Sequence, residues 1–345
     1  MIVKFWGVRG SIPTPPTQPV ILEKLKTALA RALRQKIQLE EIDQFIEDLP
    51  DSVKTVVGGN TPCLEIVSGQ DRVIIDAGTG INGLGQTLCP DEFPSDSDRL
   101  RYLVEKPQTP IKVAPYREPE HFLHLNILLT HTHWDHIQGF PFFAPIYRCG
   151  NVIDVYGLDG ERIRENLHGQ QRCSTLFPVS LNEVAAVINF RTFPKEGLQI
   201  GSIAVTAISL PHPGGCLAFK LKADDKVLVF ATDYEFIADD EDDDDKDRQA
   251  LAEFVQDADV FISDTQYTFI ESMTKEGWGH SSPLRVAEMA LHAGVKKFFL
   301  FHHDPFYSDA KLFDMLVRTR TYAKLLSNKR DMEIHLAIEG QTVEI

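Results

Sequence analysis

The sequence predicts an α/β protein, an αββα sandwich of two mixed β-sheets that lie face to face and are flanked by helices. Strand-like and helical segments follow one another in two similar halves of the chain. In both halves, strands end at a histidine or an aspartate, and such residues meet at one edge of a sheet. The 345 residues, 43% of them hydrophobic and 25% charged, suit a globular protein. This length allows two domains, but large sandwiches often stay in one piece, so we expect a single domain over residues 1–345.

The chain starts with a strand-like segment, Ile2 to Phe5, rather than a signal peptide. No stretch has the length and apolar continuity of a membrane span. Gly7 to Pro13 follows as a glycine-punctuated turn. Two interpretations of this turn are equally open: a plain loop, or a tight turn that places Arg9 or Ser11 near an anion.

Two amphipathic helices come next and predict an inserted helical hairpin at about residues 18–56. In the first, from about 20 to 36, apolar residues fall at helical spacing: Leu22, Leu25, Leu29 and Leu33. The second ends at Pro50 and has apolar residues on one side: Leu39, Ile42, Phe45, Ile46 and Leu49. Neither helix carries a cluster of ligand-type residues. The hairpin could pack on the core, cap a site or carry a subunit interface, which leaves a homodimer open.

Two short strands, 64–67 and 73–75, follow the hairpin, and the second ends at Asp76 before a Gly-x-Gly motif. An aspartate at such a position commonly ties down neighbouring loop amides, so we expect a structural role. The run that follows is rich in proline and charge and has no clear period. It predicts a loop insertion at about residues 90–118.

The most informative stretch is Thr130-His131-Thr132-His133-Trp134-Asp135-His136, which follows an apolar strand-like run from 122 to 130. His131 and His133 are two residues apart, so on an extended backbone their imidazoles leave the same face. Asp135 and His136 come where a helix is expected to begin. Four such donors in six positions at the end of a strand indicate a site for zinc, manganese or iron.

The second half of the chain repeats the pattern of a strand that ends at a donor. Predicted strands end shortly before His212, at Asp233, at Asp264 and at the pair His302-His303. These strands are 203–210, 226–230, 260–263 and 297–301, and others are expected at 152–156, 188–193, 216–221 and 333–337. Helices are predicted from Ser282 to Gly294 and from about 309 to 326.

Charge and cysteine usage exclude some classes of function. The net charge of −15 argues against a protein that binds nucleic acid through a basic field. The five cysteines are scattered and lack C-x-x-C spacing, so reduced thiols and a cytoplasmic location are expected. Residues 239–247 are nearly all aspartate and predict a solvated loop. That run lacks the glycine and the closing glutamate of an EF-hand, so we assign it no metal.

The H-x-H-x-D-H motif and the donors after it resemble the metallo-β-lactamase superfamily. The closest resemblance is to the branch of tRNA 3′-end-processing ribonucleases Z and related phosphodiesterases, and it runs over most of the chain outside the two insertions. It implies two adjacent divalent metals, zinc first, with manganese or iron as alternatives. The implied ligands are His131, His133 and His212 for the first metal, Asp135, His136 and His302 for the second, and Asp233 as the bridge between them. His303 competes with His302, which is preferred because it directly follows the strand.

The same resemblance implies a hydrolase that cleaves a small phosphodiester, with a 3′,5′-cyclic nucleotide as one candidate, by attack of a hydroxide shared between the metals. Asp135 and His280 are the catalytic candidates. His280 matches a histidine that these enzymes keep outside the metal shell, where it could protonate the leaving alkoxide. Three alternatives stay open. They are a lactone, thioester or β-lactam hydrolase, an RNA-processing nuclease without the usual basic arm, and a scaffold whose metals are only structural.

Overall fold

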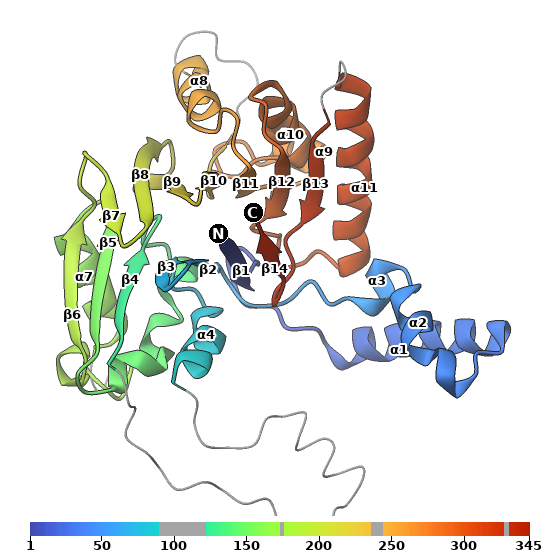
Figure 1. The fold of residues 1–345 in the computed structure, drawn as a ribbon, viewed down its shortest axis with the longest axis horizontal. Helices are drawn as coiled ribbons and strands as arrows, with labels where there is room; N and C mark the ends of the chain where they lie inside the picture. The colour runs from blue at the N-terminus through green and yellow to red at the C-terminus, as the bar shows by residue number, and fades with distance from the viewer. Residues whose placement is uncertain (90–121, 173–175, 236–243, 328–330) are drawn as a thin grey trace, which may run out of the picture.

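A computed structural model describes residues 1–89, 122–172, 176–235, 244–327 and 331–345. Figure 1 shows two β-sheets with helices on their outer sides, which confirms the predicted αββα sandwich. The expected loop insertion at about 90–118 lies outside the described residues. Within the described part of the chain, every helix is too short or too polar to cross a membrane.

The first sheet has the strand order β14-β1-β2-β3-β4-β5-β6. Strands β14, β1, β2 and β3 pair in antiparallel fashion, whereas β3 to β6 run parallel, so the sheet is mixed. Its strands are β1 (Ile2–Gly7), β2 (Cys63–Ser68), β3 (Asp71–Ile75), β4 (His124–Leu128), β5 (Val152–Gly157), β6 (Val187–Thr192) and β14 (Thr342–Glu344).

The second sheet has the order β13-β12-β11-β10-β9-β8-β7 and repeats this design. Strands β10 to β13 run parallel, and β7 to β10 pair in antiparallel fashion. Its strands are β7 (Leu198–Ile200), β8 (Ile203–Leu210), β9 (Cys216–Ala223), β10 (Lys226–Ala231), β11 (Val260–Asp264), β12 (Lys297–Phe301) and β13 (Glu333–Leu336). Parallel strands end at the same edge, so three neighbouring strands deliver their last residues to one place.

The main hydrophobic core lies between the two sheets. Phe5 of β1 packs against Phe299 and Phe301 of β12, with ring centroids 5.5 and 6.3 Å apart. Phe230 of β10 contacts Phe301 edge to face at 5.3 Å. A second cluster of buried apolar residues covers the outer face of the first sheet. Burial on both faces explains why these strands are nearly continuous apolar runs.

Helices cover the outer faces. The longer ones are α1 (Gln18–Gln35), α4 (Ile81–Leu88), α7 (Gly160–Gln170), α8 (Asp244–Phe254), α10 (Pro283–His292) and α11 (Asp309–Leu326). Short helices are η1 (Leu39–Glu41), α2 (Ile42–Glu47), α3 (Asp51–Lys54), α6 (Trp134–Ile137), η2 (Phe140–Phe142), η3 (Ala144–Tyr147), η4 (Leu181–Glu183) and α9 (Phe269–Thr274). Helix α7 packs on β5 and β6, and α10 and α11 pack on the second sheet. The α1–α2 segment projects beyond α11 (Figure 1).

The acidic run is only partly a loop. Residues 244–247 form the first turn of α8, so the predicted loop over 239–247 is wrong at its C-terminal end. Asp247 lies in this first turn, where a carboxylate interacts favourably with the helix dipole. Residues 239–243 lie outside the described part of the chain.

Candidate metal centre

The first sheet delivers four of the sequence-predicted donors through one short connection. His131 and His133 follow β4, and Asp135 and His136 lie on α6. His131, Asp135 and His136 are buried, whereas His133 is exposed. The Thr130 amide and hydroxyl donate to the Asp76 carboxylate at 2.8 and 3.0 Å, which fixes the start of this connection.

The second sheet delivers the other donors from separate strand ends. His212 follows β8, Asp233 follows β10 and His302 follows β12. Asp233 and His302 both have positive φ, 50° and 59°, and Asp76 after β3 shares this conformation with φ 62°. A left-handed residue turns the chain sharply at the end of the strand, at a cost of about 1 kcal/mol or more for a residue with a side chain. Such strain is common at functional sites.

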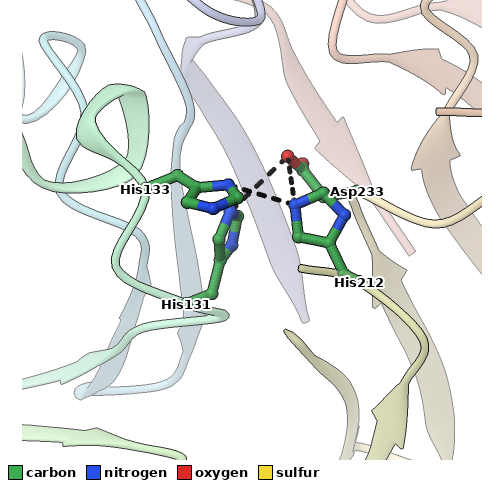
Figure 2. A group of neighbouring side chains, drawn as sticks. All are labelled: His131, His133, His212 and Asp233. Atoms are coloured by element: carbon green, nitrogen blue, oxygen red, sulfur yellow. Dashed lines mark hydrogen bonds and ion pairs between the residues drawn. The ribbon is translucent and has the colours of Figure 1, made fainter. Parts of the chain in front are cut away.

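His131, His133, His212 and Asp233 form one group of donors whose atoms lie within 4.8 Å of one another (Figure 2). His212 Nε2 is 3.0 Å from His133 Nδ1. The Asp233 Oδ2 atom is 3.6 Å from His131 Nε2 and 3.8 Å from His212 Nε2. Three imidazoles and one carboxylate oxygen therefore surround one point.

Asp135, His136 and His302 form a second group beside the first. His302 Nε2 is 3.2 Å from Asp135 Oδ2. The Asp233 Oδ1 atom is 3.3 Å from both His136 Nε2 and His302 Nε2. Asp233 thus presents one oxygen to each group, which is the arrangement of a carboxylate between two cations.

Two buried nitrogen atoms support this interpretation. His131 Nε2 and His136 Nε2 have no hydrogen-bond partner, although both point at carboxylate oxygens of the cluster. A buried polar atom without a partner costs about 1–3 kcal/mol, so such atoms are rare in native proteins. Imidazole nitrogen and carboxylate oxygen are the donors that zinc, manganese and iron accept. The residues present fit divalent metals.

The second ring nitrogens of His136 and His302 are held in place. His136 Nδ1 lies 2.8 Å from Asp76 Oδ2, and His302 Nδ1 lies 2.9 Å from Gln266 Oε1. These contacts leave both Nε2 atoms directed at the cluster. Partners of this kind fix the tautomer and orientation of a ligating histidine. Asp76 therefore holds both the Thr130 amide and the His136 ring. The contact of Gln266 with His302 was not predicted from the sequence.

The electrostatics of the cluster favour bound cations. Burial holds the pKa of His131 well below its usual value, so its imidazole stays neutral, as a metal ligand requires. Burial lowers the pKa of His212 to about 4. Burial also disfavours the charged form of His136, but the carboxylates of Asp135 and Asp233 outweigh it and raise the pKa of His136 well above its usual value. The Asp135 and Asp233 carboxylates thus favour positive charge on this side of the cluster.

The geometry separates His302 from its rival. His303 Nε2 lies 2.9 Å from the carbonyl of Ala337, and its backbone bridges to Arg9. His303 therefore faces away from the donors that surround His302. Burial lowers the pKa of His303 to about 3. The structure therefore places His302, and not His303, among the donors of the cluster.

Comparison with known proteins decides the family. Residues 71–303, more than half of the chain, match the family model described as "Beta-lactamase superfamily domain". The chain belongs to the β-lactamase superfamily. This confirms the resemblance stated from the sequence.

Similarity to individual members of the superfamily is partial in sequence and extensive in structure. Ribonuclease Z of Picrophilus torridus is 41% identical over 63 residues, which cover 18% of this chain and 20% of that protein. Ribonuclease BN of Cronobacter sakazakii is 31% identical over 108 residues, 29% of this chain and 32% of that protein. The matches thus span a third or less of these relatives. The crystal structure of unliganded yeast PDE1 has a TM-score of 0.60 at 14% identity and covers 100% of this chain and 99% of that one. YhfI from Bacillus subtilis has a TM-score of 0.58 at 16% identity, with 99% of both chains covered.

His280 forms a further group of donor-type residues with Asp233, Asp264 and His302, whose atoms lie within 4.8 Å of one another. Its Nδ1 atom is 2.6 Å from Asp264 Oδ2, and its ring stacks on His302 at 5.0 Å. Burial disfavours its charged form, but Asp264 outweighs it and raises the pKa of His280 to about 9. Asp264 is fully buried at the end of β11. Asp264 was assigned no role from the sequence. However, Asp264 ends β11, which lies between the strands that precede Asp233 and His302, and this position indicates a residue near the site.

The loop that carries His280 is fastened by Glu235. Its two carboxylate oxygens accept hydrogen bonds from the amides of Gly277 and Gly279 at 2.8 and 2.7 Å. Both glycines have positive φ, 80° and 82°. Charge-assisted bonds from two amides to one carboxylate fix the loop just before His280. Nothing in the sequence marked Glu235, because these contacts join distant positions.

The turn after β1 also contributes to the site. The Ser11 amide donates to Asp135 Oδ2 at 2.7 Å, so the anion near this turn is a donor of the cluster itself. Arg9 is buried and donates to the backbone carbonyls of Gly58, Asp304 and Tyr307, and its guanidinium lies 3.7 Å from the Asp309 carboxylate. Ser11 therefore orients the Asp135 carboxylate, and Arg9 joins three loops.

Two glycines leave room for the histidines. A Cβ atom on Gly10 would lie 2.5 Å from His302 Cε1, and one on Gly279 would lie 2.5 Å from His212 Nδ1. Both distances are far below a normal contact. These backbone segments can approach the imidazoles only because they lack a side chain.

Proposed function

We propose that this chain is a hydrolase that uses two divalent metals to cleave a small phosphodiester. The observation that carries the proposal is the position of Asp233, whose two oxygens face two separate groups of donors. A structural zinc site usually closes on four ligands, whereas six donor residues around one shared carboxylate suit a pair of ions. A scaffold with a structural metal does not need this arrangement.

In this proposal His131, His133 and His212 hold one metal, Asp135, His136 and His302 hold the other, and Asp233 bridges them. Zinc is our first candidate, with manganese or iron as alternatives, because all three accept imidazole and carboxylate ligands. When bound, such a pair polarises phosphoryl oxygens and supplies a nucleophile at neutral pH. Asp135 and Asp233 contribute two negative charges that partly offset the charge of the ions.

His280 is the group we assign to the leaving side of the reaction. Asp264 fixes its Nδ1 and thereby leaves Nε2 as the atom available to a substrate. The residue stands three positions before helix α10, whose free N-terminal amides favour an anion. Its role would be to donate the Nε2 proton to the departing alkoxide, or to hydrogen-bond a phosphoryl oxygen.

A phosphodiester is favoured over an acyl substrate because a positioned proton donor outside the metal shell helps an alkoxide to leave. Acyl hydrolysis on the same donors has no evident need for His280. Ribonuclease Z and a diphosphatase from the PhnP family are among the similar proteins, and both names refer to phosphate chemistry. The net charge of −15 favours a small substrate, such as a 3′,5′-cyclic nucleotide, over a long nucleic acid.

The test is a substrate screen with protein stripped by a chelator and then reconstituted with zinc, manganese or iron. The substrates are bis-p-nitrophenyl phosphate, 3′,5′-cyclic nucleotides, a short RNA and a panel of lactones, thioesters and β-lactams. We expect metal-dependent cleavage of the phosphodiesters and none by the stripped protein. Faster turnover of an acyl substrate, or of the RNA, would replace the proposal with that reaction.

A further inference from the structure

Helix α1 presents a row of leucines to solvent. Leu22, Leu25, Leu29 and Leu33, here called the leucine stripe, are 53–80% exposed. Their spacing places them on one face of the helix. None of the eighteen residues of α1 is buried. An amphipathic helix normally buries its apolar face, so this face lacks its partner within the described part of the chain.

The stripe is held outward by a rigid base. Lys24 Nζ donates to the carbonyls of Ser52 and Thr55, each at 2.6 Å, and pairs with Asp309 at 2.9 Å. Phe45 and Leu49 of the second segment are buried. The hairpin is therefore anchored through Lys24 to α3 and to the start of α11. The leucines stay exposed because the opposite side of α1 makes these contacts.

Further apolar side chains of the hairpin are exposed. Ile21, Leu39, Ile42 and Ile46 are 40–79% exposed. Together with the leucine stripe, the hairpin therefore has eight exposed large apolar side chains. Monomeric proteins rarely leave so much apolar surface exposed in one region without a function for it.

Charge indicates what covers this surface. Besides Lys24, which pairs with Asp309, helix α1 carries Lys26, Arg31 and Arg34 against the single acid Glu23. The next segment carries Glu40, Glu41, Asp43, Glu47, Asp48 and Asp51. A two-fold pairing that sets α1 of one copy near this acidic segment of the other would match opposite charges twice. On a chain of net charge −15, the basic helix is also where two copies repel least.

We propose that the leucine stripe is the interface of a homodimer, in which the helical hairpins of two copies pack across a two-fold axis. The alternative occupant of a basic amphipathic helix is an anionic lipid surface. The acidic segment beside α1 disfavours binding to an anionic lipid surface, because the two negative charges would repel each other. This inference stands apart from the proposed reaction, since no residue of the stripe belongs to the metal centre.

The first experiment is sedimentation velocity of the metal-loaded protein over a range of micromolar concentrations. We expect wild type to sediment at twice the 38.9 kDa of one chain. Leu25→Glu with Leu29→Glu should raise the dimer dissociation constant at least about a hundredfold, because four like charges would meet at the interface. The matched control is Val317→Glu with Leu325→Glu, at two exposed apolar positions on α11, which should remain dimeric. Circular dichroism and metal content report whether each variant is folded.

A charge reversal tests the orientation. Lys26→Glu with Arg34→Glu should weaken the dimer, and adding Glu40→Lys with Asp43→Lys should restore it. A wild-type monomer, or a dimer unchanged by the leucine substitutions in a folded protein, overturns the proposal. Co-sedimentation with phosphatidylserine vesicles, lost in the leucine variant while the free protein is monomeric, would assign the stripe to a lipid surface instead. Phosphodiester cleavage is measured separately, so failure of either proposal leaves the other standing.

Discussion

The two sheets supply the metal centre in different ways. The first sheet gives four donors from the six residues between His131 and His136, after a single strand. The second sheet gives His212, Asp233 and His302 from the ends of three strands. The donors at the edge of the first sheet, here called the first edge, thus form a local sequence motif. The donors at the edge of the second sheet, the second edge, meet only after β8, β10 and β12 have come together in the fold.

The difference teaches where the site depends on the fold. Asp233 of the second edge reaches both groups of donors, whereas each donor of the first edge belongs to one group. His280 and Asp264, which we associate with the proton, also come from the second half. The local motif would bind metals, and the second edge would pair them and direct the reaction. Substitutions at the two edges should therefore fail differently.

The largest effect is expected at Asp233. We expect about two metals per wild-type chain. Asp233→Ala should lower the occupancy of both sites and remove activity, because both groups of residues lose a donor. His133→Ala at the first edge is the matched comparison and should lower the occupancy of one metal only. Elemental analysis of protein purified without a chelator measures this. Wild-type metal content in Asp233→Ala would contradict the assignment of Asp233 as the bridging ligand.

His280→Ala should keep both metals and lower kcat on a poor leaving group by roughly two to four orders of magnitude. With p-nitrophenolate, which needs little protonation, the loss should be much smaller. The measurement is kcat on a methyl and on a p-nitrophenyl ester of the same phosphate. Equal losses on both would indicate charge stabilisation in place of proton donation, and no loss would leave His280 a packing role.

Asp76→Asn and Gln266→Ala remove the partners of one ligand from each edge. Each should weaken metal binding by about 10–100-fold, because an unsupported imidazole loses its fixed orientation. Competition with a chromogenic chelator gives both affinities. Affinities equal to wild type in either folded variant would mean that His136 or His302 is held by packing alone.

The smallest effect is expected at Glu235, which holds the loop of His280. Glu235→Gln leaves one acceptor oxygen for the two amides, so one hydrogen bond is lost and the other loses its charge. The substitution should reduce kcat/KM by about tenfold, with metal content unchanged. The exposed Glu276 in the same loop provides the control, Glu276→Gln, which should behave as wild type. A loss of metal in Glu235→Gln would show that this loop also supports the ligands.

The sequence was informative where the signal is local. The H-x-H-x-D-H motif, the strand ends and helices α1 and α11 could all be predicted, because periodicity and spacing record them. Helix α4 escaped prediction because Gly83 and Gly85 interrupt it, and α7 because its buried apolar residues are only Ile163 and Leu167. The contacts of Asp264 with His280 and of Glu235 with two backbone amides join positions that are distant in the sequence. They form only in the folded chain, so sequence spacing does not predict them.

The helical hairpin shows the limit of a periodic pattern. The leucines of α1 predict an amphipathic helix, but periodicity does not say what the apolar face contacts. Within the described part of the chain, the leucines of that face stay 53–80% exposed. The expectation that the hairpin carries an interface is therefore still a prediction, and the sedimentation experiment decides it.

The close approach of Gly10 and Gly279 to two imidazoles has a consequence for mutational tolerance. Alanine is among the mildest substitutions elsewhere in the chain, yet at these positions its methyl group would displace His302 or His212. Natural variation should therefore be as restricted at these glycines as at the donors themselves, although neither carries a reactive group. A survey of tolerated substitutions would report them as functional positions, and the reason would be the space that they leave empty.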